Sequence, residues 1–306
     1  MATKYSQVVK TVKPLKILLY GPTWSGKTMS SLLLAQGIVV AKRQLKDPEE
    51  AWQHIVLHDS EYGRGTLYAH LGTYNYIKKD APYRTEDLVQ DIQTLNADPQ
   101  IDVIIVDSFT HYWSKDGGIL EQKAAKDKLG GNSYANWQDY TEKFNKAVTS
   151  LIASPKVVIA TARAKSDRAI IQDTAGKVAV KTYGLKPDLR DDIDFEFDIV
   201  LNIDKETHSV IVDKGLVGME PTYTPITMDF GSWLETYYKQ NAVIAKRTED
   251  DVKQSITQLV KDYKLVSWFQ IDNNGRKLAD MPIDELLEAE GRLIKHIKTS
   301  QGSNKR

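Results

Sequence analysis

Short apolar runs alternate with amphipathic segments along the first two thirds of the chain. The run at residues 16–20 is short enough to be a buried strand, and the segment from Lys27 to about Arg43 reads as a helix of good helix formers. A second helix is predicted over residues 85–95, whose apolar positions share one face. The other predicted strands cover residues 54–61, 101–108, 157–161, 195–203 and 209–214. Strands that alternate with helices predict an α/β fold, with a mostly parallel sheet flanked by helices.

A glycine-rich loop joins the first strand to the first helix. Its residues, Gly21-Pro22-Thr23-Trp24-Ser25-Gly26-Lys27-Thr28, satisfy the pattern G-x-x-x-x-G-K-[ST]. In such a loop the backbone N–H groups and the helix N-terminus face the anionic oxygens of a nucleotide. The lysine supplies a point charge and the threonine offers a hydroxyl to Mg²⁺. A chance match in a turn is the alternative, but the flanking strand and helix favour a nucleoside triphosphate site.

The apolar, β-branched run at residues 101–106 ends on Asp107. This is the pattern of a buried central strand whose last residue emerges at the carboxyl edge of the sheet. In P-loop proteins an aspartate at this position helps to hold Mg²⁺. We therefore expect Asp107 and Thr28 to be the metal-binding residues, with the aspartate acting through water.

Residues 54–61 form a predicted strand that also ends in acidic residues, Asp59 and Glu61. Ligands of parallel α/β sheets bind beyond the carboxyl ends of the strands, so both side chains should fall near the phosphates. A carboxylate there can orient or deprotonate the attacking water. Alternatively, Glu61 merely begins the loop at residues 62–65. We favour Glu61 as the catalytic base, because a hydrolase needs such a group and the chain offers few other candidates.

Basic residues gather after the predicted strand at residues 157–161. Arg163 and Lys165 come just past its carboxyl end, where polar groups can sense a γ-phosphate. The segment that follows, up to residue 192, has β-branched pairs on both sides of Ala175-Gly176 and predicts a mobile hairpin. A basic hairpin is suited to contact the phosphate backbone of DNA, and a solvated loop without a ligand is an equal alternative. The candidate DNA-binding residues are Lys165, Arg168, Lys177 and Lys181.

The chain divides into three predicted regions. Residues 1–14 form a polar arm that either frays or docks on a neighbouring subunit, residues 15–240 form the ATPase core, and residues 241–306 form a helical appendage with a tail. The net charge is +0, so any nucleic-acid surface must be a local basic patch. The absence of cysteine excludes disulfides, zinc–thiolate sites and cysteine nucleophiles. No apolar run approaches the ~18 residues of a membrane span, which predicts a cytosolic protein that does not bind membranes.

Taken together, these motifs resemble the RecA-type ATPases encoded by phages and prophages. The resemblance covers roughly residues 15–238. It rests on the glycine-rich loop, Asp59-Ser60-Glu61 and the segments at 106–113, 116–120, 130–134, 160–165, 184–187, 190–191 and 195–198. It implies a RecA-like core that uses ATP, a homo-oligomer in the form of a ring or filament, and the cytoplasm of a bacterial host as location. Some similar proteins resemble single-strand annealing recombinases.

The resemblance also implies roles for individual residues. Lys27 and Thr28 would bind phosphates and Mg²⁺, Asp107 would hold the metal, and Glu61 would activate water. The hairpin at residues 164–190 would lie where RecA places a mobile DNA-binding loop. Members of the family often show Lys-Asp-Arg where this chain has Val212-Asp213-Lys214. Lys214 is therefore the cation left there to reach the phosphates of a neighbouring subunit.

Two functions remain open at this point. The first is a DNA-stimulated ATPase that promotes annealing or strand exchange on single-stranded DNA, together with a single-strand-binding protein. The second is an ATP-dependent switch or loader that acts mainly on protein partners, which the neutral charge and the helical appendage favour mildly. A small-molecule kinase is disfavoured, because no lid-like arginine cluster follows the loop.

Overall fold

The computed structural model describes residues 12–130, 132–172, 178–244, 249–273, 275–282, 285–286, 288–293 and 296. Contacts divide the chain into two compact units, one of residues 12–238 and one of residues 239–306 with 1–11. The predicted N-terminal arm lies outside the described residues except for residues 12–14, and the predicted tail lies outside them altogether.

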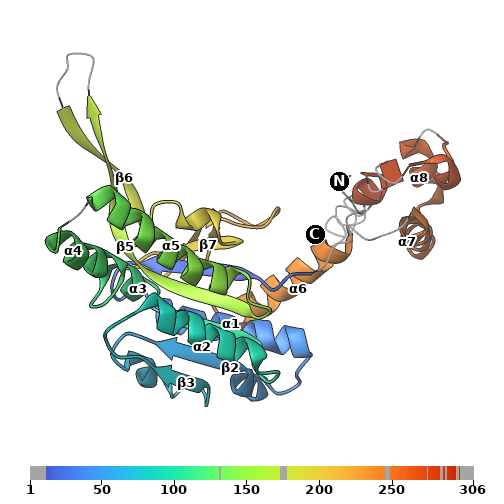
Figure 1. Ribbon diagram of the computed structural model, residues 1–306. Helices are drawn as coiled ribbons and strands as arrows, with labels where there is room; N and C mark the ends of the chain where they lie inside the picture. The colour runs from blue at the N-terminus through green and yellow to red at the C-terminus, as the bar shows by residue number, and fades with distance from the viewer. Residues whose placement is uncertain are drawn as a thin grey trace, which may run out of the picture. The chain divides into compact units, whose positions relative to one another are not determined.

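A mostly parallel sheet forms the centre of the larger unit (Figure 1). Its strand order is β3-β2-β4-β5-β1-β7-β8-β9. From β3 to β7 in this order, neighbouring strands pair in parallel, while β8 and β9 are added antiparallel at one edge. The strands are β1 (Lys16–Gly21), β2 (Ile55–Asp59), β3 (Asn75–Lys78), β4 (Val103–Asp107), β5 (Val157–Gln172), β6 (Val178–Pro187), β7 (Ile199–Ile203), β8 (Val210–Lys214) and β9 (Thr222–Tyr223).

Helices cover both faces of this sheet. One face packs against α1 (Lys27–Arg43), η1 (Pro48–His54) and the first part of α6 (Met228–Ile244). The opposite face packs against α2 (Thr85–Ala97), α3 (Thr110–Ser114), α4 (Ile119–Lys128) and α5 (Ser133–Ile152). Short 3₁₀ turns, η2 (Arg64–Tyr68) and η3 (Ile193–Phe195), lie in the connecting loops.

The apolar runs of the sequence explain this three-layer arrangement. Successive residues of a strand point to opposite faces of the sheet. In β1, Ile17 and Leu19 belong to the core under α1, while Leu18 and Tyr20 belong to the core under α2 and α5. A strand that is buried on both faces needs a continuous apolar run, as parallel sheets require. The predicted fold class, a mostly parallel α/β sheet flanked by helices, is confirmed.

Strand β5 is longer than the sequence predicted. The expected strand at residues 157–161 continues to Gln172, because β5 leaves the central sheet and pairs antiparallel with β6. Arg163 and Lys165 therefore lie within a strand and not beyond its end. Figure 1 shows the resulting β5–β6 hairpin projecting from the core. The predicted hairpin is thus present, with residues 173–177 outside the described part.

The smaller unit is helical. It contains α7 (Glu249–Asp262), α8 (Val266–Asp272) and η4 (Leu278–Asp280), and residues 285–286, 288–293 and 296 are also helical. Its core includes Val252, Ile256, Phe269, Leu286 and Leu293. Among the helices that the structure describes, in either unit, none has the length and apolarity to cross a membrane.

Candidate functional site

The glycine-rich loop closes tightly between β1 and α1. Gly26 precedes the helix with a φ of 89°, in the left-handed region where glycine carries no steric penalty. A side chain at Gly21 would meet the carbonyl oxygen of Ile203 at 2.6 Å, so β1 and β7 approach closely here only because this residue is glycine. As at the start of any α-helix, the first N–H groups of α1 have no partner within the helix, so they can bind an anion.

Lys27 is held by the loop that precedes it. Its Nζ donates to the carbonyl oxygens of Gly21 at 3.0 Å and Pro22 at 2.8 Å. Burial lowers the pKa of Lys27, while the carboxylates of Asp107 and Glu61 oppose this shift. The ammonium is thus partly desolvated and poised beside the loop, where a phosphate is a stronger partner than two carbonyls.

Asp107 lies at the carboxyl end of β4 and is buried. Its Oδ2 accepts a hydrogen bond from Thr28 Oγ1 at 2.5 Å, and its Oδ1 accepts one from Thr161 Oγ1 on β5. Burial raises the pKa of Asp107, against the opposing effect of these two hydroxyl donors. The carboxylate is therefore fixed in orientation but pays a desolvation penalty, which a bound cation would relieve.

The donor set at Asp107 fits Mg²⁺. A carboxylate and a threonine hydroxyl are hard oxygen ligands, and Mg²⁺ characteristically uses one or two carboxylates together with substrate phosphates and water. Among the residues that the structure describes, no group of three or more histidine, aspartate or glutamate side chains could hold a metal by itself. With only Asp107 and Thr28 as protein ligands, the ion would take its other ligands from the phosphates of the nucleotide and from water.

Glu61, in the loop after β2, and Arg163, on β5, form an ion pair close to the glycine-rich loop. Arg163 Nη2 lies 2.9 Å from Glu61 Oε1 and 3.0 Å from Oε2, and its Nε lies 3.2 Å from Oε1. Arg64 is a weaker partner, with Nη1 3.8 Å from Oε2. The guanidinium thus forms a charge-assisted fork on the carboxylate.

His111 completes this network from α3. Its Nδ1 lies 2.8 Å from the carbonyl oxygen of Ser60, and its Nε2 lies 3.0 Å from Arg163 Nη2. Burial lowers the pKa of His111, which is consistent with a neutral ring that donates through Nδ1 and accepts through Nε2. The ring therefore supports the position of the arginine.

Asp59, which the sequence placed near the phosphates, shapes the loop instead. Its Oδ1 accepts from the N–H of Glu61 at 2.6 Å, and its Oδ2 accepts from the N–H of Gly65 at 2.8 Å. The hydroxyl of Tyr76 donates to the same Oδ2 at 2.8 Å. These bonds fold the chain back after β2 and direct Glu61 into the cavity.

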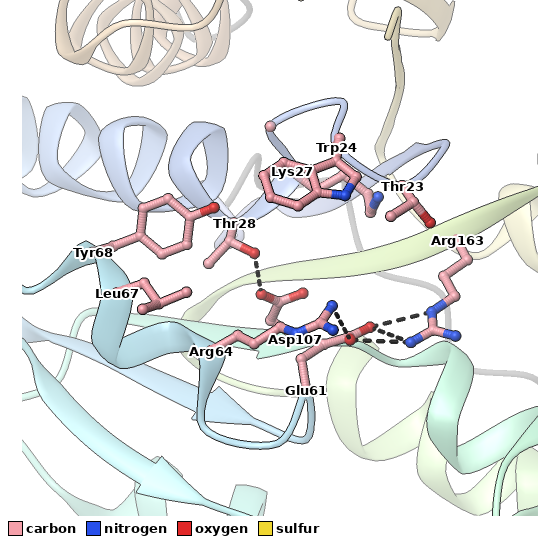
Figure 2. A pocket seen from close by; sticks show the side chains of 11 residues that line it. Thr23, Trp24, Lys27, Thr28, Glu61, Arg64, Leu67, Tyr68, Asp107 and Arg163 are labelled. Atoms are coloured by element: carbon pink, nitrogen blue, oxygen red, sulfur yellow. Dashed lines mark hydrogen bonds and ion pairs between the residues drawn. The ribbon is translucent and has the colours of Figure 1, made fainter.

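A cavity of about 250 Å³ brings these groups together (Figure 2). It lies at the carboxyl edge of the sheet, between the glycine-rich loop, η2 and β5. Trp24, which is 85% exposed, lines it from the glycine-rich loop. The residues that line it are Thr23, Trp24, Gly26, Lys27, Thr28, Glu61, Arg64, Leu67, Tyr68, Asp107 and Arg163.

Comparison with protein families identifies the core. A family model described as an AAA domain, AAA_24, matches residues 13–225, which is more than half of the chain. The chain belongs to the AAA_24 family. It is thus a P-loop ATPase by family. Among curated proteins none matches. A solved structure that is similar is the KaiC-like protein of the hyperthermophilic archaeon Pyrococcus horikoshii OT3, at 14% identity and a TM-score of 0.37, over 70% of this chain and 83% of that one.

The other residues predicted to bind the nucleotide, Gly21, Pro22, Ser25 and Lys214, do not line the cavity of this AAA_24 protein. Lys214, at the end of β8, donates to the carbonyl oxygens of Asp194 and Phe195 at 3.3 and 3.0 Å and does not line the cavity. Pro22 and Ser25 are loop residues that also do not line it. Whether Lys214 reaches the phosphates of a neighbouring subunit stays a prediction.

The four candidate DNA-binding residues differ in their surroundings. Lys165 lies at the root of the hairpin, where its Nζ donates to the carbonyl of Leu189 and lies 3.8 Å from both Asp188 and Asp191. Arg168 is exposed on β5, opposite Thr182. Lys177 falls outside the described residues, as does the side chain of Lys181.

Sequence reasoning missed three contributors to the AAA_24 site: Thr161, His111 and Arg64. Thr161 stands out as a polar residue within the apolar run of β5, which is a signal that could have been read. His111 lies in the first turn of α3, the helix that follows β4 closely, and so falls near the end of that strand. Arg64 belongs to the loop at residues 62–65, to which the sequence pattern assigned no role in the site.

Proposed function

We propose that this AAA_24 protein binds ATP with Mg²⁺ in the cavity at the glycine-rich loop and hydrolyses it, and that it couples this reaction to single-stranded DNA. The observation that carries the ATPase proposal is the convergence of Lys27, the Thr28–Asp107 pair and Glu61 on one cavity. These are the groups needed to bind a triphosphate, orient a metal and accept a proton from water.

Each residue has a distinct part in the proposed reaction. Lys27 exchanges its two carbonyl partners for phosphate oxygens, and the N–H groups at the start of α1 bind the same anion. Thr28 and Asp107 hold Mg²⁺, which when bound neutralises charge on the phosphates. Glu61 takes the proton of the attacking water. For this, Arg163 must release the Glu61 carboxylate. The γ-phosphate is the anion that can draw the guanidinium away from Glu61.

The proposed coupling to DNA rests on strand β5. Within this one strand, Thr161 contacts the carboxylate of Asp107, Arg163 contacts Glu61, and the residues from Ala164 onward pair with β6 in the hairpin. A change in the hydrogen bonds of Arg163 therefore acts on the root of the hairpin directly. This supports a DNA contact that is made by the hairpin and controlled by the nucleotide, and not one that depends on the net charge of the protein.

An ATP-dependent switch or loader that acts on protein partners is the second candidate. The pairing of cations at the hairpin root favours it. Lys165 lies near Asp188 and Asp191, and Lys186 lies 3.2 Å from Asp167 and 3.0 Å from Asp191. Paired lysines contribute less to counterion release on DNA than free ones do.

We also propose that the protein works as a homo-oligomer in which Lys214 of one subunit acts on the nucleotide of another, since Arg163 lines the cavity of its own subunit. A cation supplied in trans can accelerate hydrolysis by about 10³–10⁵. Specific activity should then rise with protein concentration. A flat specific activity, at a monomeric mass throughout, would contradict this part of the proposal.

The experiment that tests the proposed function compares ATP hydrolysis with and without single-stranded DNA. Reactions contain Mg²⁺, and Lys27→Ala, which removes the charge beside the triphosphate, is the inactive control. Stimulation by DNA, and by a single-strand-binding protein bound to it, supports the first candidate. Hydrolysis without any DNA binding, in every nucleotide state, supports the second. No hydrolysis and no ATP binding by the unmodified protein would refute both.

A further inference from the structure

A second cavity, unrelated to the nucleotide site, lies within the smaller unit. It is a groove of about 560 Å³ between α7, α8 and the turn that leads into η4. The residues that line it are Ile256, Thr257, Val260, Lys261, Lys264, Val266, Phe269, Gln270, Gly275, Arg276, Lys277 and Leu278. In volume it exceeds the cavity at the glycine-rich loop.

The floor of this groove is apolar. Ile256 and Phe269 are buried members of the core of this unit, and Val260 and Leu278 pack against them while still lining the groove. Val266, at the first turn of α8, is 54% exposed at the edge of the same floor. A groove with this lining matches the apolar side chains of a bound segment better than it matches water.

The rim of the groove is basic. Lys261, Lys264 and Lys277 are exposed along it, and none of them forms an ion pair with a carboxylate in the described part of the chain. Arg276 is the exception, since its Nη1 lies 2.5 Å from Glu285 Oε2. Three cations around an apolar floor favour a ligand that carries carboxylates on either side of its apolar residues.

The chain's own ends do not have this character. Residues 1–11 contain Lys4 and Lys10, residues 297–306 contain Lys298, Lys305 and Arg306, and neither segment contains an aspartate or a glutamate. A basic segment is repelled by a basic rim. Charge therefore favours an occupant from another molecule.

We propose that this groove binds an acidic amphipathic peptide segment of a partner protein. The segment seats its apolar side chains against Val260, Val266 and Phe269 and pairs its carboxylates with the rim lysines. This is the helix-in-groove mode of recognition, with a charged border that sets specificity. The groove belongs to the smaller unit, so the proposal is independent of the ATPase reaction and goes beyond it.

The test uses the full-length protein without nucleotide and a fluorescein-labelled peptide, read by fluorescence anisotropy. The peptide, of about 14 residues, carries leucine and phenylalanine at i, i+3, i+4 and i+7 and aspartate or glutamate elsewhere. Two further peptides serve as controls: one scrambles the order of the same residues, and the other replaces every acidic residue by lysine. Saturable binding of the first peptide alone is the expected result.

Variants then locate the binding. The triple substitution Lys261→Glu, Lys264→Glu and Lys277→Glu should weaken binding by about tenfold or more, because the rim then repels the peptide. Val266→Asp should weaken binding by a similar factor, because it places a charge at the edge of the apolar floor. These are exposed positions, so folding should survive. The matched control replaces exposed lysines of the larger unit, Lys46, Lys126 and Lys205, by glutamate and should leave affinity unchanged.

Four outcomes overturn the proposal. The first is equal binding of the scrambled or the lysine peptide, and the second is unchanged affinity in the rim variant. The third is self-association that Val266→Asp abolishes in sedimentation, which would make a second copy the occupant. The fourth is displacement of the peptide by single-stranded DNA from the rim lysines, which would make nucleic acid the ligand. Failure of ATP hydrolysis has no bearing on any of them.

Discussion

The guanidinium of Arg163 grips both carboxylate oxygens of Glu61, with Nη2 2.9 Å from Oε1 and 3.0 Å from Oε2. These are the residues that we assign to phosphate sensing and to general-base catalysis. While the guanidinium holds both oxygens, the carboxylate is oriented toward Arg163 and is not free to turn toward a water molecule. In the proposed mechanism the resting site is therefore held inactive, and arrival of the γ-phosphate frees the base.

Replacing Glu61 by glutamine should separate binding from hydrolysis. The amide cannot take a proton from water, so kcat should fall by about 10²–10⁴ while ATP affinity is retained. Steady-state hydrolysis and equilibrium binding of a fluorescent ATP analogue measure the two. Glu206→Gln, in an exposed turn, is the matched control. Hydrolysis at the unmodified rate in Glu61→Gln would show that the base lies elsewhere.

Replacing Arg163 by alanine should affect the choice between nucleotides. If the guanidinium turns to the γ-phosphate, its loss should reduce the preference for ATP over ADP by about 10- to 100-fold, the range of hydrogen bonds to charged groups. Glu61→Gln should keep that preference. Competition binding with both nucleotides gives the ratio, with Arg84→Ala, at an exposed position, as control. An unaltered ATP-to-ADP ratio would exclude Arg163 as the sensor.

Thr161→Val tests whether the hydroxyl on β5 orients the metal-binding aspartate. The change keeps the β-branched shape but removes the donor to Asp107 Oδ1. The Mg²⁺ concentration for half-maximal hydrolysis should rise by about 2- to 10-fold, as for loss of one hydrogen bond. Thr236→Val, whose hydroxyl bonds to Ser232 on α6, should leave it unchanged. A chelator should stop hydrolysis in every variant. Superimposable Mg²⁺ titrations would contradict the orienting role.

His111 should make the stability of the core depend on pH. Burial lowers the pKa of His111, whose ring faces Glu61, Arg163 and Lys115. As the pH falls below about 6.5, the unfolded chain binds a proton at this residue before the folded chain does, so the free energy of unfolding decreases. His111→Gln removes this contribution, of up to about 1.4 kcal/mol per pH unit.

Chemical unfolding of the unmodified protein and of His111→Gln, at about pH 7.5, 6.5 and 5.5, measures the effect. The two proteins should differ in slope across this range, because the other histidines are common to both. Parallel slopes would mean that His111 is not held neutral by the fold.

The proposed DNA contact of the β5–β6 hairpin predicts how affinity for DNA depends on salt concentration. Replacing Arg168, Lys177 and Lys181 by alanine should lower the affinity for single-stranded DNA and reduce the slope of log K against log salt by about 0.7 per lost contact. ATP hydrolysis without DNA should barely change. Lys165→Ala is an informative comparison: its amine is already near two carboxylates, so its loss should change the slope less. An unchanged slope in the triple variant, with an ATP analogue bound, would place DNA contact elsewhere.

Local signals account for what the sequence predicted well. Apolar runs of strand length, and glycines at the turn between strand and helix, depend on neighbours in the chain, so the sheet and the glycine-rich loop could be read directly. The position of Asp107 at the end of β4 follows from the same run.

The contacts within the site could not be read in this way. Glu61 and Arg163 are separated by 102 positions, and they meet because β2, β4 and β5 are adjacent in the sheet. That order is a property of the whole fold. The length of β5 was missed for a related reason: a strand continues past its apolar run when a partner strand satisfies its backbone, and the partner here, β6, comes later in the chain.

The continuity of β5 gives it the mechanics of a lever. From Ala164 to Gln172 it extends for roughly 30 Å beyond the nucleotide cavity, at ~3.3 Å per residue. In the proposed mechanism, a small rotation at Arg163, as its guanidinium exchanges Glu61 for a phosphate, would be magnified in proportion to that length at Gln172. The register shift between Asp167 and Arg168 is a weak point within the described part of this lever, because bulges interrupt the ladder that stiffens paired strands. Bending at this bulge would reduce the displacement that is transmitted along β5 from Arg163, whereas a regular ladder would transmit it in full.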